Sequence, residues 1–367
     1  MAEYKTLVKK IPVSPDKKTK QKDYLKKGRL PIVDQGQSLV GGYTDDADMA
    51  VKCELPVIVF GDHTRAVKYI TFPFGAGADG IKVLQPKENI LPPFLYYGTQ
   101  YIVAKMPNRG YARHYQYVEK EDLPVPSLPE QERIVARIEE LFSQLDAGVE
   151  TLKKTKAQLA VYRQAVLKEA FEKVSARVLL GSISESRLGK MLDSEKNIGV
   201  PRRYLRNINV RWHSFDLSDL SEMPIEENEV GKYSLRKGDL VICEGGEPGR
   251  CAVWESDDVI FYQKALHRVR FTDSSNPKFY MYYLWYAAQT GQLKSLFTGT
   301  GIKHLTGQSL VKVLVPTAER ITQDSIVNEI ETHLSVCDSI EHTVDLALQQ
   351  AEAMRQSILK DAFEGRL

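Results

Sequence analysis

Apolar residues recur along two long segments of the chain with the three- and four-residue spacing of an amphipathic helix. In residues 128–174 the stripe comprises Ile134, Ile138, Leu141, Leu145, Val149, Leu152, Leu159 and Val166. In residues 317–367 it comprises Ile326, Ile330, Leu334, Cys337, Ile340, Val344, Leu348, Ala351 and Ile358. One stripe sustained over several heptads is typical of helices that pack on another helix. Each segment therefore predicts a helix of about 44 residues, roughly 65 Å long at about 1.5 Å per residue.

The two helical segments are copies of one another. Residues 123–172 align with residues 315–364 without a gap, and the matched pairs include Pro124 with Pro316, Gln131 with Gln323, Asp146 with Asp338, and Arg163 with Arg355. Both copies end in Ala-Phe-Glu, at 170–172 and 362–364. A repeat of this length sets the architecture, so the chain predicts a globular unit followed by a helix, twice over.

A helix with a single apolar stripe buries it most simply against the matching helix of the same chain. We therefore predict an α+β fold, in which two mixed α/β domains are separated by two long antiparallel coiled-coil helices, with pseudo-two-fold symmetry within one chain. The predicted segments are a first globular domain at 1–127, a helix at 128–174, a second globular domain at 175–316 and a helix at 317–367. A coiled coil that joins separate chains is the alternative.

The two globular segments show the same order of short patterns. Val57–Phe60 and Asp239–Cys243 have the composition of buried strands, and each is followed by a glycine-containing loop that ends in an arginine. An aromatic-rich helix opened by proline follows in each, near 92–97 and 277–285. The order predicts two domains that share a plan while their surfaces differ.

Charge is distributed unevenly although the formal net charge is only +2. Residues 1–29 hold ten Lys or Arg against three Asp or Glu, and residues 177–316 also carry a small positive excess. Basic regions attract polyanions, although a lysine run is also typical of a plain solvated face. The four cysteines are dispersed and no long apolar run occurs, so we expect a cytoplasmic protein with no membrane span, disulfide scaffold or zinc site.

Two short motifs resemble enzyme signatures without their structural context. Residues 75–80 match Gly-x-Gly-x-x-Gly, but an alternating strand-like run follows where a cofactor loop needs a helix, so we expect a glycine-rich turn. Leu91–Phe94 differs by its leucine from the Asn/Asp-Pro-Pro-aromatic motif of amino-group DNA methyltransferases. A leucine side chain cannot accept hydrogen bonds from a target amine, so we expect a helix start here. We expect no catalytic and no metal-binding residues.

The repeated segments are similar to those of a known family, the specificity subunits of type I restriction-modification systems. The proline-rich lead at 123–131, the helix end at 162–172 and its copy at 359–365 carry the resemblance, and the duplicated order spans essentially the whole chain. The second copy departs from the pattern, because only Gln323 remains of its Leu-Pro-Glu-Gln stretch. The first domain is also short, so we expect it either to be incomplete or to be completed by the residues after Phe363.

The resemblance implies a non-catalytic subunit that specifies a DNA sequence. Each globular domain would be a target recognition domain that reads one half of a split site in double-stranded DNA, and the helices would set the spacing. The helices would also dock two methyltransferase subunits, which carry S-adenosylmethionine. Restriction and translocase subunits, with ATP and Mg²⁺, would complete the phage-defence enzyme, and this chain itself would hold no cofactor.

Side chains that read DNA lie on loops, where arginine suits guanine, asparagine or glutamine suits adenine, and lysine suits phosphate. The first domain offers Lys17, Lys18, Lys20, Lys22, Arg65, Asn108, Arg109 and Arg113 as candidate DNA contacts. The second offers Arg202, Arg203, Arg206, Arg250, Lys303, His304 and Gln308. A DNA methyltransferase and a structural coiled-coil adaptor are the alternative functions.

Overall fold

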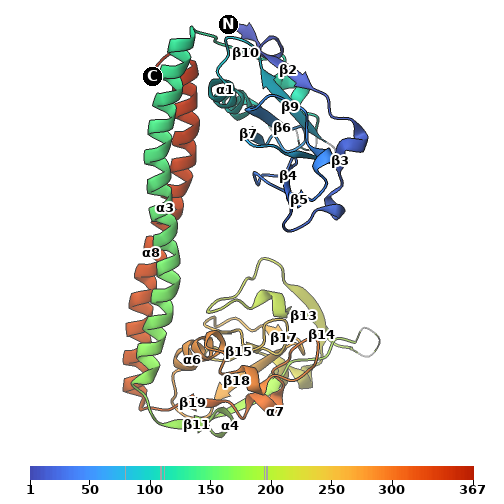
Figure 1. Cartoon of the computed structure of the whole chain (residues 1–367). Helices are drawn as coiled ribbons and strands as arrows, with labels where there is room; N and C mark the ends of the chain where they lie inside the picture. The colour runs from blue at the N-terminus through green and yellow to red at the C-terminus, as the bar shows by residue number, and fades with distance from the viewer. Residues whose placement is uncertain (79, 108–109, 111, 194, 196) are drawn as a thin grey trace. The chain divides into compact units, whose positions relative to one another are not determined.

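The computed structural model describes residues 1–367 except 79, 108, 109, 111, 194 and 196 (Figure 1). The chain forms two compact units. Unit 1 contains Met1–Lys154 together with Val344–Leu367, and unit 2 contains Thr155–Thr343. Each unit is therefore a globular part attached to one half of each long helix.

The two long helices are α3 (Leu128–Glu172) and α8 (Arg320–Phe363), and they run antiparallel inside each unit. In unit 2, Arg163 pairs with Asp338 at 2.7 Å, and Lys173 pairs with Glu329 at 3.2 Å. In unit 1, Arg355 pairs with Asp146. The matched Arg and Asp positions of the sequence repeat thus become equivalent ion pairs between the helices, and the predicted pairing within one chain is confirmed.

The globular part of unit 1 contains two four-stranded sheets. The first has the order β2 (Val8–Ile11), β9 (Ile81–Pro86), β6 (Val57–Gly61), β7 (Val67–Ile70), and all its pairs are antiparallel. The second has the order β3 (Lys18–Thr19), β8 (Gly75–Gly77), β4 (Leu30–Val33), β5 (Gly42–Thr44), and β8 runs parallel to both neighbours. The remaining regular elements are α1 (Pro92–Lys105), α2 (Tyr115–Val118) and the pair formed by β1 (Ala2–Glu3) with β10 (Asp122–Leu123).

The globular part of unit 2 repeats this arrangement. Its first sheet has the order β12 (Ser184–Leu188), β18 (Leu266–Phe271), β15 (Leu240–Cys243), β16 (Cys251–Val253). Its second sheet has the order β14 (Ser221–Ile225), β13 (Val200–Leu205), β17 (Phe261–Tyr262), again with a parallel pair at β13 and β17. The other elements are α4 (Leu180–Ile183), α5 (Val230–Tyr233), α6 (Pro277–Gln289), α7 (Gly307–Leu310) and the pair formed by β11 (Arg177–Leu179) with β19 (Leu314–Pro316). The expectation of two mixed domains with one plan is confirmed.

Short 3-10 turns lie between these elements. They are η1 (Tyr4–Thr6), η2 (Pro15–Lys17), η3 (Gln21–Asp23), η4 (Ala47–Met49), η5 (Asn207–Asn209), η6 (Glu227–Glu229) and η7 (Lys294–Leu296).

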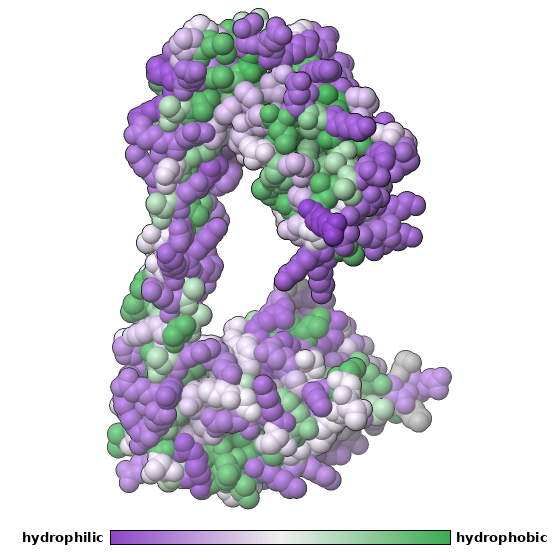
Figure 2. Space-filling model, in the orientation of Figure 1, coloured by the Kyte–Doolittle hydropathy of each residue, from purple (hydrophilic) through white to green (hydrophobic). Residues whose placement is uncertain are grey.

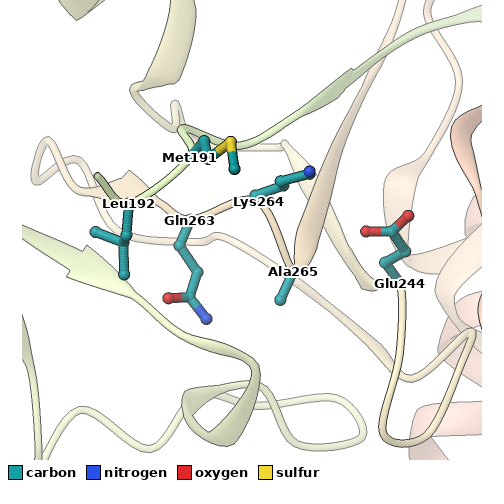
Figure 3. A pocket seen from close by; sticks show the side chains of 6 residues that line it. All are labelled: Met191, Leu192, Glu244, Gln263, Lys264 and Ala265. Carbon is teal, nitrogen blue, oxygen red and sulfur yellow. The ribbon is translucent and has the colours of Figure 1, made fainter. Parts of the chain in front are cut away.

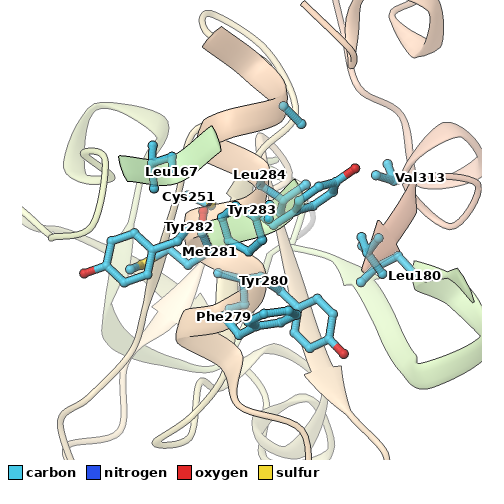
Figure 4. Close-up of a cluster of buried hydrophobic side chains, with 14 of the residues drawn as sticks. Leu167, Leu180, Cys251, Phe279, Tyr280, Met281, Tyr282, Tyr283, Leu284 and Val313 are labelled. Carbon is cyan, nitrogen blue, oxygen red and sulfur yellow. Dashed lines mark hydrogen bonds between the residues drawn. The ribbon is translucent and has the colours of Figure 1, made fainter. Parts of the chain in front are cut away.

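The aromatic helix of each unit is the centre of its core. In unit 2, α6 lies between the sheet and the long helices, and its residues 279–284 are all buried (Figure 4). Phe171 of α3 packs on Phe279, Tyr283 and Tyr286 of α6 at 5.4–6.0 Å between ring centroids. In unit 1, Phe363 of α8 packs on Phe94 and Tyr101 of α1 in the same way. Each buried aromatic side chain contributes on the order of 1.5–3 kcal/mol, so this contact joins each globular part to its helix pair.

A buried glutamine fastens the start of each aromatic helix. Gln131 accepts a hydrogen bond from the backbone N–H of Leu91 at 2.9 Å and donates to the carbonyls of Asn89 and Pro126. Gln323 accepts from the backbone N–H of Asn276 at 2.7 Å and donates to the carbonyl of Ala318. Leu91 and Asn276 are the N-cap residues of α1 and α6. This shared task gives a physical reason why the second copy keeps its glutamine when the residues around it change.

The residues after Phe363 pack into unit 1. Leu367 packs against the same apolar cluster as Ala2, and its backbone oxygen accepts a hydrogen bond from Arg133 at 3.0 Å. These contacts agree with the expectation that the C-terminal residues complete the first globular part.

The glycine-rich motif, expected to be a turn, is partly a strand: residues 75–77 are extended, Ala78 and Gly80 lie in bends, and Asp79 lies outside the described residues. Gly75–Gly77 forms β8, the fully buried strand between β3 and β4. A Cβ atom on Gly77 would lie 2.4 Å from Asp34 Cβ and 2.5 Å from the Tyr24 hydroxyl. Gly77 is therefore needed for close packing between strands, which local sequence does not distinguish from the needs of a turn.

Candidate functional site

Four loops of unit 2 meet at one edge of its sheets. The loop that follows β15 begins with Glu244, whose backbone N–H donates to the Ala265 carbonyl at 2.9 Å and whose carbonyl accepts from Leu305 at 2.7 Å. Asn207, just after β13, donates its side-chain amide to the Gly245 carbonyl at 2.7 Å. Hydrogen bonds to backbone groups thus hold together loops that lie far apart in the sequence.

A hollow of about 320 Å³ opens beside this loop cluster (Figure 3). It is lined by Met191, Leu192, Glu244, Gln263, Lys264 and Ala265. Met191 is 61% exposed and Leu192 is 48% exposed, so two apolar side chains face solvent beside a carboxylate, an amide and an ammonium group. This set offers donors, acceptors and apolar contact area, which are the three kinds of group that read base edges.

The structure brings three of the predicted residues of unit 2 to this cluster, although two of them are already engaged. Arg250 donates to Glu247 and to the Asn207 carbonyl, both at 3.0 Å, and only 17% of its side chain is exposed. Arg206 donates to the Asp219 carboxylate at 2.6 Å. The exposed residue His304 places its ring beside Gly245, where a Cβ atom would lie 3.0 Å from Nδ1. Arg250 and Arg206 therefore shape the loops through internal contacts.

The other predicted residues of unit 2 lie on exposed positions. Arg202 and Arg203 are on β13, opposite Met223 and Glu222 of β14. Lys303 donates to the Gly299 carbonyl at 2.7 Å, which closes the loop in which Thr298 and His304 exchange backbone hydrogen bonds. Gln308 is exposed on α7. These side chains are accessible to a polyanion, and their role in DNA binding stays a prediction.

Unit 1 has a loop cluster at the equivalent strand ends. The Asp62 N–H, just after β6, donates to the Gly80 carbonyl at 2.6 Å, and the Thr64 hydroxyl donates to the Gln35 carbonyl. The Asp62 carboxylate accepts from the Tyr115 N–H at 2.8 Å and lies 3.4 Å from the Lys82 ammonium. In both units, therefore, hydrogen bonds to backbone groups hold the loops together.

The predicted residues of unit 1 are only partly gathered at its cluster. Arg65 lies there in a left-handed conformation, φ +60°, and donates to the Met106 carbonyl at 3.3 Å, while Arg113 is exposed. Asn108 and Arg109 lie outside the described residues. The four lysines lie on the segment from η2 to η3, with Lys17, Lys20 and Lys22 exposed and Lys18 half-buried on β3.

Two amide residues at the clusters were missed by sequence reasoning. Gln35 and Asn207 each lie two residues beyond the end of a central strand, β4 and β13. The side-chain oxygen of each is buried, with no hydrogen-bond partner within the described part of the chain. No local pattern marks these residues, because their neighbours come from loops that only the fold brings together.

The acid–base character of unit 2 is set mainly by burial. Burial raises the pKa of the Cys243 thiol to about 11 and lowers the pKa of His267, which contacts the Leu305 carbonyl at 3.1 Å. Among the residues that the structure describes, no group of three or more His, Cys, Asp or Glu side chains could hold a metal ion.

The chain is similar to proteins of a known class. Residues 10–160 match the family model of the type I restriction modification DNA specificity domain. Two of the similar proteins are the specificity subunit of the StySPI type I restriction enzyme of Salmonella potsdam, 29% identical over 272 residues, and that of the EcoKI enzyme of Escherichia coli K12, 25% identical over 273 residues. Each match covers 67% of this chain and 58% of the relative.

Solved structures share the fold over the whole chain. A structure that concerns complex assembly and conformational transition of the type I R-M system aligns with a TM-score of 0.73 at 16% identity, covering 100% of this chain and 97% of that one. The HsdS subunit of Thermoanaerobacter tengcongensis aligns with a TM-score of 0.57 at 18% identity, covering 100% and 96%. The resemblance to type I specificity subunits, expected from the sequence, is therefore confirmed. In the described part of the chain no helix has the length and apolar content to cross a membrane.

Proposed function

We propose that this chain is a non-catalytic specificity subunit of a type I restriction-modification enzyme. The loop cluster of unit 1 reads one half of a bipartite DNA site, and the loop cluster of unit 2 reads the other half. The observation that carries this proposal is the repeated plan, in which equivalent strand ends of two units present different side chains. Divergent loops on one scaffold suit two different half-sites.

In each unit, exposed cations outside the loop cluster and polar side chains within it make different contacts with DNA. Arg202, Arg203 and Lys303 in unit 2 contact phosphates, as Lys17 and Arg113 do in unit 1. In unit 2, Gln263 and Glu244 at the hollow face base edges, where an amide suits adenine and a carboxylate accepts from the amino group of cytosine. Arg206 and Arg250 hold these loops in position.

The helices are the docking surface for two methyltransferase subunits. Exposed apolar side chains on α3 and α8 support this proposal, among them Val161 at 67%, Met354 at 56% and Val336 at 54% exposure. Figure 2 shows such isolated apolar patches among the hydrophilic side chains of the helices. The methyltransferase subunits bring S-adenosylmethionine, restriction and translocase subunits bring ATP and Mg²⁺, and the assembly works in the cytoplasm.

Methylation of genomic DNA tests this function. The chain is expressed together with the methyltransferase subunit of the proposed enzyme, and methylated adenines are mapped by sequencing. A motif with two specified halves and an unspecified gap is expected. Because phosphate contacts are independent of sequence, replacing Arg202 and Arg203 by alanine should weaken methylation of all sites alike without changing the motif, and Lys17→Ala with Arg113→Ala should do the same from unit 1.

Two outcomes would overturn the proposal. Methyl transfer by the purified chain alone, with S-adenosylmethionine and DNA, would make it a methyltransferase. If the methyltransferase methylated the same motif with and without this chain, the chain would not specify the sequence and would be a structural coiled-coil adaptor.

A further inference from the structure

The positions of α1 and α6 can be matched one to one. Tyr101 stacks on Phe363 in unit 1 as Tyr286 stacks on Phe171 in unit 2, with 5.3 and 6.0 Å between ring centroids. The N-cap residues Leu91 and Asn276 have the same sequence separation from these tyrosines and the same bond to a buried glutamine. By this correspondence, Tyr97 and Gln100 of α1 match Tyr282 and Trp285 of α6.

In unit 2 the surface beside Tyr282 and Trp285 is covered by the loop that connects β13 to β14. The ring of His213 lies 4.2 Å from that of Trp285 and 5.1 Å from that of Tyr282, in an edge-on and a tilted contact. The neighbouring Trp212 packs against the same apolar cluster and donates to Glu247 at 2.7 Å. The loop therefore places an aromatic and an imidazole ring over α6.

In unit 1 the equivalent place is a hollow of about 420 Å³. Its lining comes from α1, α3 and α8 and comprises Tyr96, Tyr97, Gln100, Glu139, Phe142, Ser143, Asp146 and Arg355. Arg355 lies 4.3 Å from the centre of the Phe142 ring and also pairs with Asp146, so the floor of the hollow is ordered. The aromatic walls remain open to an incoming group, with the Glu139 carboxylate beside them, whereas the Asp146 carboxylate is already paired with Arg355.

The chain itself explains the difference between the units. Residues 206–220 connect β13 to β14 in unit 2, whereas only residues 34–41 connect β4 to β5 in unit 1. The shorter connection carries no aromatic or histidine residue. In addition, Gln100 stands where unit 2 has the large indole of Trp285. Unit 1 thus keeps the walls of this site and lacks the segment that fills it.

We propose that the hollow of unit 1 is a docking site for a segment of a partner protein that presents an aromatic or imidazole side chain, as Trp212 and His213 do in unit 2. In the assembly of the proposed function, on which this inference rests, the partner is one methyltransferase subunit. The two methyltransferase subunits then dock unequally, because only the one at unit 1 reaches into such a hollow. The Glu139 carboxylate favours a partially positive imidazole edge, and the tyrosines favour ring contacts.

A matched pair of substitutions tests this docking site. Ser143 lies at the rim of the hollow, and Ser335 is its counterpart in the sequence repeat; both are exposed on the long helices. Ser143→Trp fills the hollow with an indole without removing a buried side chain, whereas Ser335→Trp adds the same indole where the site is already filled. Binding of the purified methyltransferase to each full-length chain is measured by native mass spectrometry and sedimentation.

The wild-type chain and Ser335→Trp are expected to bind two methyltransferase copies alike. Ser143→Trp is expected to bind one copy as before and the other at least tenfold more weakly. A photoreactive benzoyl-phenylalanine at Gln100 should cross-link to a methyltransferase segment that contains His, Trp, Tyr or Phe, and one at the exposed Ala104 should not. Equal binding by all three chains, together with no cross-link at Gln100, would overturn the docking site alone, whereas a wild-type chain that binds no methyltransferase would overturn the proposed function as well.

Discussion

The side chain of Gln131 joins the start of α3 to the segment before α1 in unit 1. It is fully buried and makes three hydrogen bonds to backbone groups of residues 89, 91 and 126. Gln131→Leu keeps the size of the side chain and leaves these buried groups unpaired, which costs about 1–3 kcal/mol for a group without a partner. We expect the free energy of unfolding to fall by about 3 kcal/mol. Urea unfolding measures it, with Gln144→Leu, an exposed position on the same helix, as the control. Equal effects of the two substitutions would show that this junction does not depend on the amide.

His213 gives unit 2 a dependence on pH. Burial lowers the pKa of His213 to about 4, although Asp338 opposes the shift. The unfolded chain, with an ordinary histidine pKa near 6.5, therefore binds more protons than the folded chain between about pH 6.5 and pH 4. The contribution of the neutral ring is fully present above pH 6.5 and is lost as the pH falls through that window. It amounts to about 1–3 kcal/mol.

The measurement for His213 is a difference between two chains. Unfolding by urea is followed from pH 7 to pH 4 for the wild type and for His213→Asn, since asparagine tolerates the φ of +68° at this position. Carboxylates titrate in both chains, so the histidine contribution is the gap between the two curves. A gap that stays constant over this pH range would mean that His213 titrates normally.

At the scale of elements, the helices were predictable and the loop contacts were not. The apolar stripes specify α3 and α8 because every third or fourth residue must contact another helix. This spacing can be read from the local sequence alone. The strands β6 and β15 were predictable because each is a short continuous apolar run, which is typical of a strand buried on both faces. By contrast, the loop position of Arg250 predicts a DNA contact, and its hydrogen bond to the Asn207 carbonyl depends on a loop from another sheet.

The loop after β15 depends on a glycine that only the fold identifies. Gly246 has φ +74°, and a Cβ atom there would lie 2.8 Å from the side-chain nitrogen of Asn207. Gly246→Ala is expected to cost about 1–2 kcal/mol in backbone strain and to displace the Asn207 amide from the Gly245 carbonyl. The unfolding free energy should fall accordingly, and methylation should lose selectivity in one half-site. Gly231→Ala is the control, because nothing lies within 4 Å of its Cβ position in α5. A Gly246→Ala chain with unchanged stability and selectivity would show that this loop is not held as described.

At the scale of the whole molecule, the proposed function makes α3 and α8 a spacer whose length sets the gap between half-sites. Inserting seven residues into α3 after Lys154 and seven into α8 after Thr343 keeps the heptad pattern and both matched Arg–Asp pairs, because each pair stays within its own unit. The insertion lengthens each helix by about 10 Å and turns it by only about 20° relative to a heptad repeat. Since DNA rises about 3.4 Å per base pair, the unspecified gap in the methylated motif should change by about three base pairs, with both half-sites unaltered.

Sequencing of methylated DNA from cells that express the lengthened chain with its methyltransferase measures this gap. An insertion in α3 alone is the control, because it breaks the register of the pair and should abolish methylation. A lengthened chain that is folded and active on the original motif would refute the spacer role while leaving sequence recognition by the two units intact.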